Sequence, residues 1–132
     1  MYKKPYAIVS LKMHTDPRGS LFEILRFKDE KIPGKGYVYC FTINPGQERG
    51  GHYHTKKHEW FSCVSGKATV IIQAKKGKKK EILLNAAKPT VVYCSPYTLH
   101  ALYNKTNKTA VIISYGSRQH DPNDPDTIKK DL

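Results

Sequence analysis

Three side chains in the middle of this sequence are spaced so that they could share one chemical site. His52 and His54 lie two residues apart, and Glu59 follows five residues later. Alternate residues of a β-strand point to the same face, so a strand here would aim both imidazoles at one spot. Glu59 could add a carboxylate oxygen from the next pass of the chain, and His100 is the obvious candidate for a fourth ligand. Such nitrogen and oxygen donors suit Zn, Fe, Mn, Ni or Co.

The segments around these residues are short and rich in β-branched and aromatic side chains, which predicts strands. We expect strands over residues 6–13, 20–27, 37–43, 59–65, 67–73, 81–85, 90–94, 100–104 and 110–115. Ser65-Gly66 carries a hairpin signal between two of them. Frequent turn residues and the lack of long helical spacing indicate an all-β sandwich or barrel of the jelly-roll type. The polar tail, residues 120–132, is expected to wrap over the outside or over a partner subunit.

Length and composition fit one domain over residues 1–132. No apolar run approaches the ~18 residues of a membrane span, and the N-terminus lacks a signal peptide's apolar segment. We therefore expect a cytoplasmic protein with no membrane contact.

Cys40, Cys63 and Cys94 lie in apolar, strand-like runs and are expected to be reduced core residues. Trp60 should face away from Glu59, between sheets or in a dimer contact, and His58 should lie at the surface.

The formal net charge of +12 raises the question of whether this protein binds nucleic acid. Much of the charge lies in five lysines between residues 75 and 80, which are read as a solvated hairpin tip. No recognition helix or stacked aromatic motif accompanies them, so nucleic acid is not expected as a partner. A positive field of this kind would also attract an anionic substrate such as a nucleotide diphosphate.

Residues 46–66, GQERGGHYHTKKHEWFSCVSG, resemble the first motif of the cupin superfamily, whose every spacing they keep. Pro96, His100 and Asn104 resemble the second motif, although Pro96 is one residue closer and Thr98 replaces a common glycine. The resemblance implies a double-stranded β-helix, the cupin jelly roll, in its RmlC-like form. It also implies that His52, His54, Glu59 and His100 bind a divalent metal.

Three further segments resemble sugar-modifying cupins. Residues 16–23, DPRGSLFE, and residues 48–54, ERGGHYH, are similar to segments of dTDP-4-dehydrorhamnose 3,5-epimerases. The end, DPNDPDT, is similar to the close of the zinc-binding C-terminal cupin domain of capsular-polysaccharide UDP-sugar reductase/epimerases, a resemblance that covers essentially the whole chain. The rhamnose enzymes have Gln at the position of His54 and need no metal. Sugar 3,4-ketoisomerases have Gln at the position of Glu59.

The resemblance implies a nucleotide-sugar epimerase of polysaccharide biosynthesis. It would invert C3, or C5, beside the ketone of a UDP- or dTDP-4-keto-6-deoxyhexose, with zinc as the expected metal and a homodimer as the expected assembly. His52 would be either the base or a metal ligand, and both roles stay open. Tyr115 or Tyr39 would return the proton from the other face of the sugar.

Three charged residues are candidates for binding the substrate. Arg49 would bind the diphosphate or stabilise the enolate, and Arg18 is a second phosphate candidate. Glu23 would either lie near the sugar or pair with a lysine. The alternatives are a 3,4-ketoisomerase, another metal cupin such as a dioxygenase or phosphosugar isomerase, and a non-catalytic sugar-binding cupin.

Overall fold

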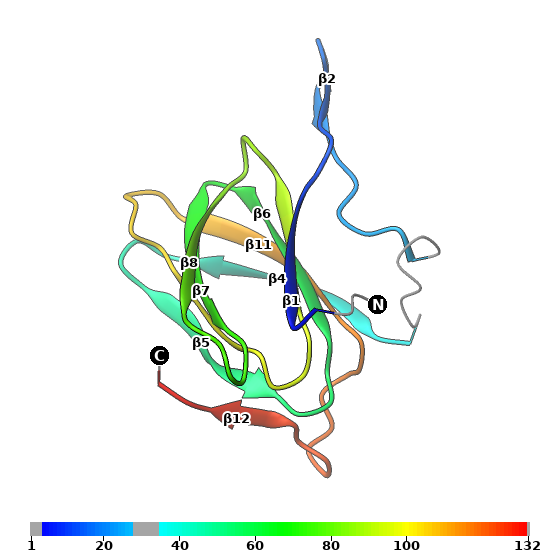
Figure 1. Cartoon of the computed structure of the whole chain (residues 1–132). Helices are drawn as coiled ribbons and strands as arrows, with labels where there is room; N and C mark the ends of the chain where they lie inside the picture. Colours follow the sequence, from blue (N-terminus) through cyan, green and yellow to red (C-terminus); the bar gives the residue numbers. More distant parts are fainter. Residues whose placement is uncertain (1–3, 28–34, 132) are drawn as a thin grey trace.

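The computed structural model describes residues 4–27 and 35–131, and its strands form two five-stranded antiparallel sheets that face each other (Figure 1). The first sheet has the order β1 (Tyr6–Ser10), β9 (Thr90–Cys94), β6 (Glu59–Ser65), β11 (Ala110–Gly116) and β4 (Tyr37–Ile43). The second has the order β12 (Thr127–Lys129), β5 (Glu48–His54), β10 (Leu99–Tyr103), β7 (Lys67–Gln73) and β8 (Lys80–Asn85). The predicted all-β, double-stranded β-helix is confirmed.

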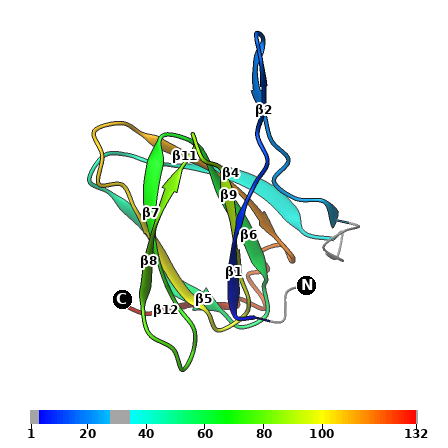
Figure 2. The same cartoon turned by 45° about the horizontal axis from the view of Figure 1, so that its top comes forward.

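A small hairpin stands away from the two sheets (Figures 1 and 2). It consists of β2 (His14–Asp16) and β3 (Gly19–Leu21), which pair with each other alone. All six of its strand residues are exposed. Among the described residues, no helix is long and apolar enough to cross a membrane.

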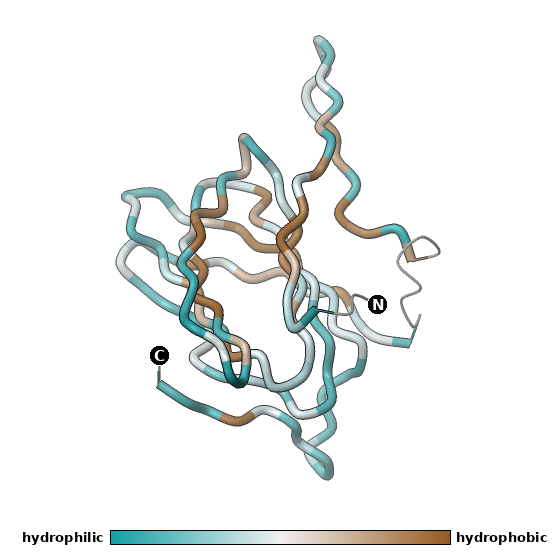
Figure 3. Tube along the Cα trace, viewed as in Figure 1, coloured by the Kyte–Doolittle hydropathy of each residue, from teal (hydrophilic) through white to brown (hydrophobic). Residues whose placement is uncertain are grey.

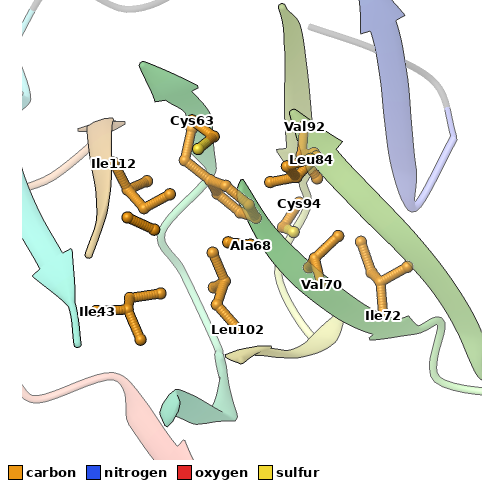
Figure 4. Close-up of a cluster of buried hydrophobic side chains, with 12 residues drawn as sticks. Ile43, Cys63, Ala68, Val70, Ile72, Leu84, Val92, Cys94, Leu102 and Ile112 are labelled. Carbon is orange, nitrogen blue, oxygen red and sulfur yellow. The ribbon is translucent and has the colours of Figure 1, made fainter. Parts of the chain in front are cut away.

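The main core lies between the sheets, where the inward side chains of both layers meet (Figure 4). Apolar residues alternate with outward-facing residues along strands such as β4, whereas β6 and β9 in the first sheet are buried on both faces. The hydropathy trace follows this rule, with apolar stretches along the strands and polar loops at the ends (Figure 3). The largest fully buried aliphatic side chains of this core are Ile43, Val70, Ile72, Leu84 and Ile112.

The Ser65-Gly66 turn does not form the predicted hairpin. β6 pairs with β9 and β11, whereas β7 pairs with β8 and β10 in the other sheet. Both strands carry continuous buried runs. Because β6 and β7 belong to different sheets, each strand can bury one of its faces against the opposite sheet. The chain therefore crosses from one sheet to the other at Gly66. The lysine-rich tip does join a hairpin, formed by β7 and β8.

The predicted strand over residues 20–27 is also wrong beyond Leu21. The side chains of Ile24 and Leu25 instead pack on a second apolar cluster, on the outer face of the first sheet. This packing buries apolar surface without adding a strand to the sheet. The opening strand ends at Ser10 rather than Met13, and residues 28–34, between two of the expected strands, lie outside the described residues.

Trp60 is the centre of that second cluster. It is fully buried, with its ring centroid 5.0 Å from that of Tyr93 and 5.9 Å from that of Tyr115. The prediction that Trp60 faces away from Glu59 is confirmed. His58 is half-buried rather than at the surface, because its ring stacks on Trp60 and its Nδ1 lies 2.7 Å from the Tyr93 hydroxyl. Cys40, expected in the core, is exposed on the outer face of edge strand β4.

Gly50 fixes how closely β5 approaches β10. Its φ is +90°, and a Cβ there would lie 3.0 Å from the carbonyl oxygen of His100. The register between these strands shifts at the same place, between His100 and Ala101. The glycine therefore allows a bulge that places His100 beside His52.

We expect Gly50→Ala to destabilise the protein by about 2–3 kcal/mol, because it adds a clash to a strained backbone. Gly46→Ala is the matched control, since Gly46 also has a positive φ, +77°, but nothing lies within 4 Å of its Cβ position. This control should lose only about 1 kcal/mol. Urea unfolding measures both variants, and equal losses would show that the contact with His100 is of no consequence.

Candidate active site

The structure brings His52, His54, Glu59 and His100 together between the two sheets. One ligand atom from each lies within 4.8 Å of the others. The ring centroids of His52 and His54 are 4.7 Å apart, and those of His52 and His100 are 4.9 Å apart. Three of the four side chains are buried, and His52 is partly exposed. All four residues named from the sequence therefore come together in this group, which we call the His/Glu cluster.

The cluster draws on three strands. His52 and His54 lie on β5 and point inward together, as their two-residue spacing requires. His100 comes from the neighbouring β10, where it lies opposite His52. Glu59 begins β6 in the facing sheet and completes the cluster from the other side.

Glu59 is ionised within this cluster. Burial alone would raise its pKa, but contacts with His100 and His54 outweigh burial and hold the pKa well below its usual value. Its Oε2 accepts a hydrogen bond of 2.8 Å from the Tyr39 hydroxyl. Burial and the Glu59 charge together raise the pKa of Tyr39, so Tyr39 keeps its proton.

His52 is neutral at physiological pH. Burial lowers its pKa to about 4, helped by repulsion from His100 and His54. A neutral imidazole has a lone pair available for a proton or for a metal ion. Both roles proposed for His52 require this state.

The contribution of His52 to the stability of the metal-free protein should therefore fall as the pH drops. His100 contributes in the opposite sense above its ordinary pKa of 6.5, because contacts with Cys94 and Glu59 outweigh burial and raise its pKa. The unfolded chain protonates His52 near its ordinary value of 6.5, whereas the folded chain holds it neutral down to about 4. The unfolded state thus binds more protons between these values, and stability is lost as the pH falls through them. Glu59 adds to the loss below its ordinary pKa of 4.5.

Urea midpoints of chelator-treated protein at pH 7.5 and pH 5.5 measure this effect. A His52→Gln variant, which does not titrate, should show a smaller difference between the two pH values. The unaltered protein should lose more stability than His52→Gln on going from pH 7.5 to pH 5.5, and an equal change in the two proteins would contradict the expectation.

Two buried atoms of the cluster show that a metal ion fits it. His54 Nε2 and Glu59 Oε1 are in contact, yet neither has a hydrogen-bond partner among the described residues. His100 Nε2 lies 3.5 Å from the same carboxylate oxygen. Buried polar atoms are costly unless they are satisfied, and a cation between them would satisfy them. Three imidazole nitrogens and one carboxylate oxygen match the donor set of tetrahedral zinc.

A cavity of about 310 Å³ opens beside the cluster. It is large enough for a small polar ligand group. Ten residues line it: Tyr39, Phe41, Arg49, Gly50, His52, Glu59, Phe61, His100, Leu102 and Ser114. Arg49 is held at its rim, because its Nε donates a 2.8 Å hydrogen bond to the Thr42 carbonyl and its guanidinium lies over Phe41.

Three other predicted site residues do not reach this cavity. Tyr115 is buried on the opposite face of β11 in the Trp60 cluster, because the inward position belongs to its neighbour Ser114. Arg18 lies in the turn of the β2–β3 hairpin and pairs with Asp16 at 2.6 Å. Glu23 pairs with Arg26 at 2.8 Å on the exposed N-terminal segment.

Sequence reasoning missed the apolar and hydroxyl residues of the cavity wall. Phe41 and Ser114 both line the cavity. Phe41 alternates with Tyr39, so the same two-residue rule could have found it. Ser114 could have been found once the register of β11 was known.

Three comparisons with known proteins agree with this architecture. The sequence matches a solved structure of the capsular polysaccharide assembling protein CapF from Staphylococcus aureus at 30% identity and a TM-score of 0.71, over 92% of this chain and 33% of that one. A UDP-2-acetamido-2,6-beta-L-arabino-hexul-4-ose reductase of Pseudomonas aeruginosa is 34% identical over 116 residues, which are 87% of this chain and 30% of the reductase. The chain thus spans about a third of the length of these relatives.

A more distant structure shares the fold. ChmJ, a 3'-monoepimerase from Streptomyces bikiniensis in complex with dTDP-quinovose, superposes with a TM-score of 0.80 at 18% identity, over 91% of this chain and 67% of that one. The family described as "Polysaccharide biosynthesis C-terminal domain" matches residues 14–128, from β2 into β12. The chain belongs to this family, as the resemblance to capsular-polysaccharide enzymes predicted.

Proposed function

We propose that this chain is a nucleotide-sugar epimerase of polysaccharide biosynthesis, which inverts C3 of a UDP- or dTDP-4-keto-6-deoxyhexose. The observation that carries the proposal is the cavity in which the neutral His52, the protonated Tyr39 and Arg49 converge beside the His/Glu cluster. The family supports a role in polysaccharide biosynthesis, because the relatives of this chain include a UDP-sugar reductase and a capsular polysaccharide assembling protein. Zinc is the metal we assign to the cluster.

The reaction needs a group that removes a proton from the carbon beside a ketone. Such a proton is acidic because the resulting enolate places its negative charge on oxygen. Arg49 at the rim would stabilise that charge or hold the diphosphate. Tyr39 keeps its proton and lies at the cavity wall, so it can donate that proton to the opposite face of the enolate.

His52 has one of two roles in this scheme. As the base, its neutral imidazole takes the C3 proton. As a fourth ligand, its lone pair is used, so the base that removes the C3 proton would be a group other than His52, and Tyr39 would act only as the donor that returns a proton. A zinc ion held by the cluster would polarise the ketone oxygen as a Lewis acid.

Two measurements test the proposal. The first is the metal content of protein purified without affinity metal, and the second is exchange of solvent deuterium into the carbons beside the ketone. About one zinc per chain, with exchange at C3 and an inverted product, would support it. Exchange with the ketone moved to C3 would make the chain a 3,4-ketoisomerase instead.

Other outcomes would overturn the sugar-epimerase assignment. Iron together with oxygen consumption and no exchange would favour a dioxygenase. Turnover of a phosphosugar alone would favour a phosphosugar isomerase. No exchange into any 4-keto nucleotide sugar would favour a non-catalytic sugar-binding cupin.

We also propose that the chain forms a homodimer. Large apolar side chains are exposed on the hairpin and on edge strand β4, where Leu21 is 61% and Val38 is 66% exposed. Single exposed apolar side chains are common on protein surfaces, so the proposal rests on the cupin resemblance, and these two residues are the ones we place in the interface. Light scattering after size-exclusion chromatography would show twice the chain mass, and the mass of a single chain would contradict the proposal.

A further inference from the structure

The C-terminal segment of the chain lies directly behind one residue of the His/Glu cluster. Strand β12 pairs with β5 on the side away from β10, and Thr127 lies opposite His54 in the register (Figure 1). The hydroxyl Oγ1 of Thr127 is 3.2 Å from Nδ1 of His54. This is the ring nitrogen that points away from Glu59, whereas Nε2 contacts that carboxylate.

Asp126 approaches the same nitrogen. It is 8% exposed, and its Oδ1 lies 3.7 Å from His54 Nδ1. Its other oxygen, Oδ2, accepts hydrogen bonds from the backbone N–H groups of Lys56 (3.2 Å) and Lys57 (2.8 Å). The carboxylate is thus fixed in place by the turn that follows β5, and its free oxygen faces the imidazole.

We propose that Thr127 and Asp126 are positioning residues for His54, holding a proton on Nδ1 so that Nε2 is directed at the site. A hydroxyl and a carboxylate oxygen both accept a hydrogen bond, so Nδ1–H is the species that suits them. A second hydrogen bond of this kind fixes the orientation and tautomer of a ligating histidine and raises its basicity. The inference rests on the proposed function only in giving Nε2 its use as a zinc ligand.

Simple docking of the tail can be separated from this role. Asp124 ties the same segment to the body of the protein through ion pairs with Lys56 at 2.8 Å and Arg118 at 3.0 Å. The Asp124 carboxylate is not among the groups that contact His54. Asp124→Asn is therefore a matched control, which weakens the docking of the tail without removing an acceptor from Nδ1.

The first test needs neither metal nor activity. Nitrogen-15 NMR of the histidine rings in metal-free protein at pH 7.5 should show a proton on His54 Nδ1, whether or not Nε2 also carries one toward the Glu59 carboxylate. Thr127→Val and Asp126→Asn should each reduce that protonated population. Thr127→Ser, which keeps the hydroxyl, and Asp124→Asn should leave it as in the unaltered protein. A wild-type Nδ1 without a proton, or identical spectra for all variants, would overturn the inference.

The second test measures zinc affinity by competition with a chelator and the visible spectrum of the cobalt-substituted protein. Loss of an outer-shell partner typically weakens metal binding by about 10–100-fold. We expect at least about a tenfold weaker zinc Kd for Thr127→Val and Asp126→Asn, with a changed cobalt spectrum and near-normal values for Thr127→Ser. Equal zinc affinity in Asp126→Asn, Thr127→Val and Asp124→Asn would count against the positioning role.

The two tests also separate this inference from the proposed function. An unaltered protein that binds no zinc would overturn the metal assignment, while the NMR result would still decide whether the tail sets the His54 tautomer. A protein that binds zinc normally in every tail variant would leave the metal assignment standing and remove the positioning role.

Discussion

His52→Ala is expected to reduce the rate of deuterium exchange into the 4-keto sugar by at least about a hundredfold. His52 is neutral, partly exposed and in contact with the cavity, so it is available either to the substrate or to a metal ion. Loss of a general base alone typically costs about 10²–10⁴ in rate. Loss of a ligand would remove one of only four donors in the cluster.

The zinc content of the same variant distinguishes the two roles of His52. A variant that keeps zinc but loses exchange would identify His52 as the base, whereas loss of both would identify a ligand. His120→Ala is the control, because His120 is exposed and lies in the tail before β12. It should exchange within about twofold of the unaltered protein, as expected for a surface position. Near-normal exchange in His52→Ala would exclude both roles.

Trp60→Ala is expected to destabilise the fold by about 3–5 kcal/mol, the usual range for removing a buried aromatic side chain. The indole is fully buried between Tyr93 and Tyr115, and the N-terminal segment packs over it through Ile24 and Leu25. Its removal would leave a cavity on the outer face of the first sheet. A lower urea midpoint, with the slope unchanged, would report the loss.

Two further variants define what Trp60 contributes. Trp60→Phe keeps a ring and removes a buried N–H that has no hydrogen-bond partner among the described residues. It should therefore lose less than about 2 kcal/mol. Leu83→Ala, at a side chain that is 59% exposed on β8, should change stability by less than about 0.5 kcal/mol. A Trp60→Ala loss as small as that of Leu83→Ala would mean that the outer cluster does not support the fold.

Part of the His/Glu cluster could be predicted from spacing along the sequence. Residues two apart on a strand point to the same face, and this rule needs no knowledge of the rest of the fold. It placed His52 with His54, and it could also have placed Phe41 with Tyr39. Only the distant His100 needed a family motif in addition, since a spacing rule says nothing about which strands become neighbours.

The errors arose where the outcome depended on tertiary partners. Residues 22–27 have a strand-like composition, but Ile24 and Leu25 pack against the Trp60 cluster rather than forming a strand of the sheet. Cys40 alternates as expected, yet its face is exposed because β4 is an edge strand. Tyr115 is a candidate only through the resemblance to the epimerases, and a one-residue difference puts it on the opposite face of β11 from Ser114. None of these facts can be read from a segment alone.

The His/Glu cluster takes its donors from both layers of the fold, with Glu59 in one sheet and His52, His54 and His100 in the other. A cation bound there would act as a cross-link between the layers, comparable to a disulfide that closes a long loop. Its binding free energy would add to the stability of the folded state alone. Amide hydrogen exchange should then slow in both sheets together when zinc is added, including strands such as β8 that carry no ligand, because separating the sheets would first require release of the ion.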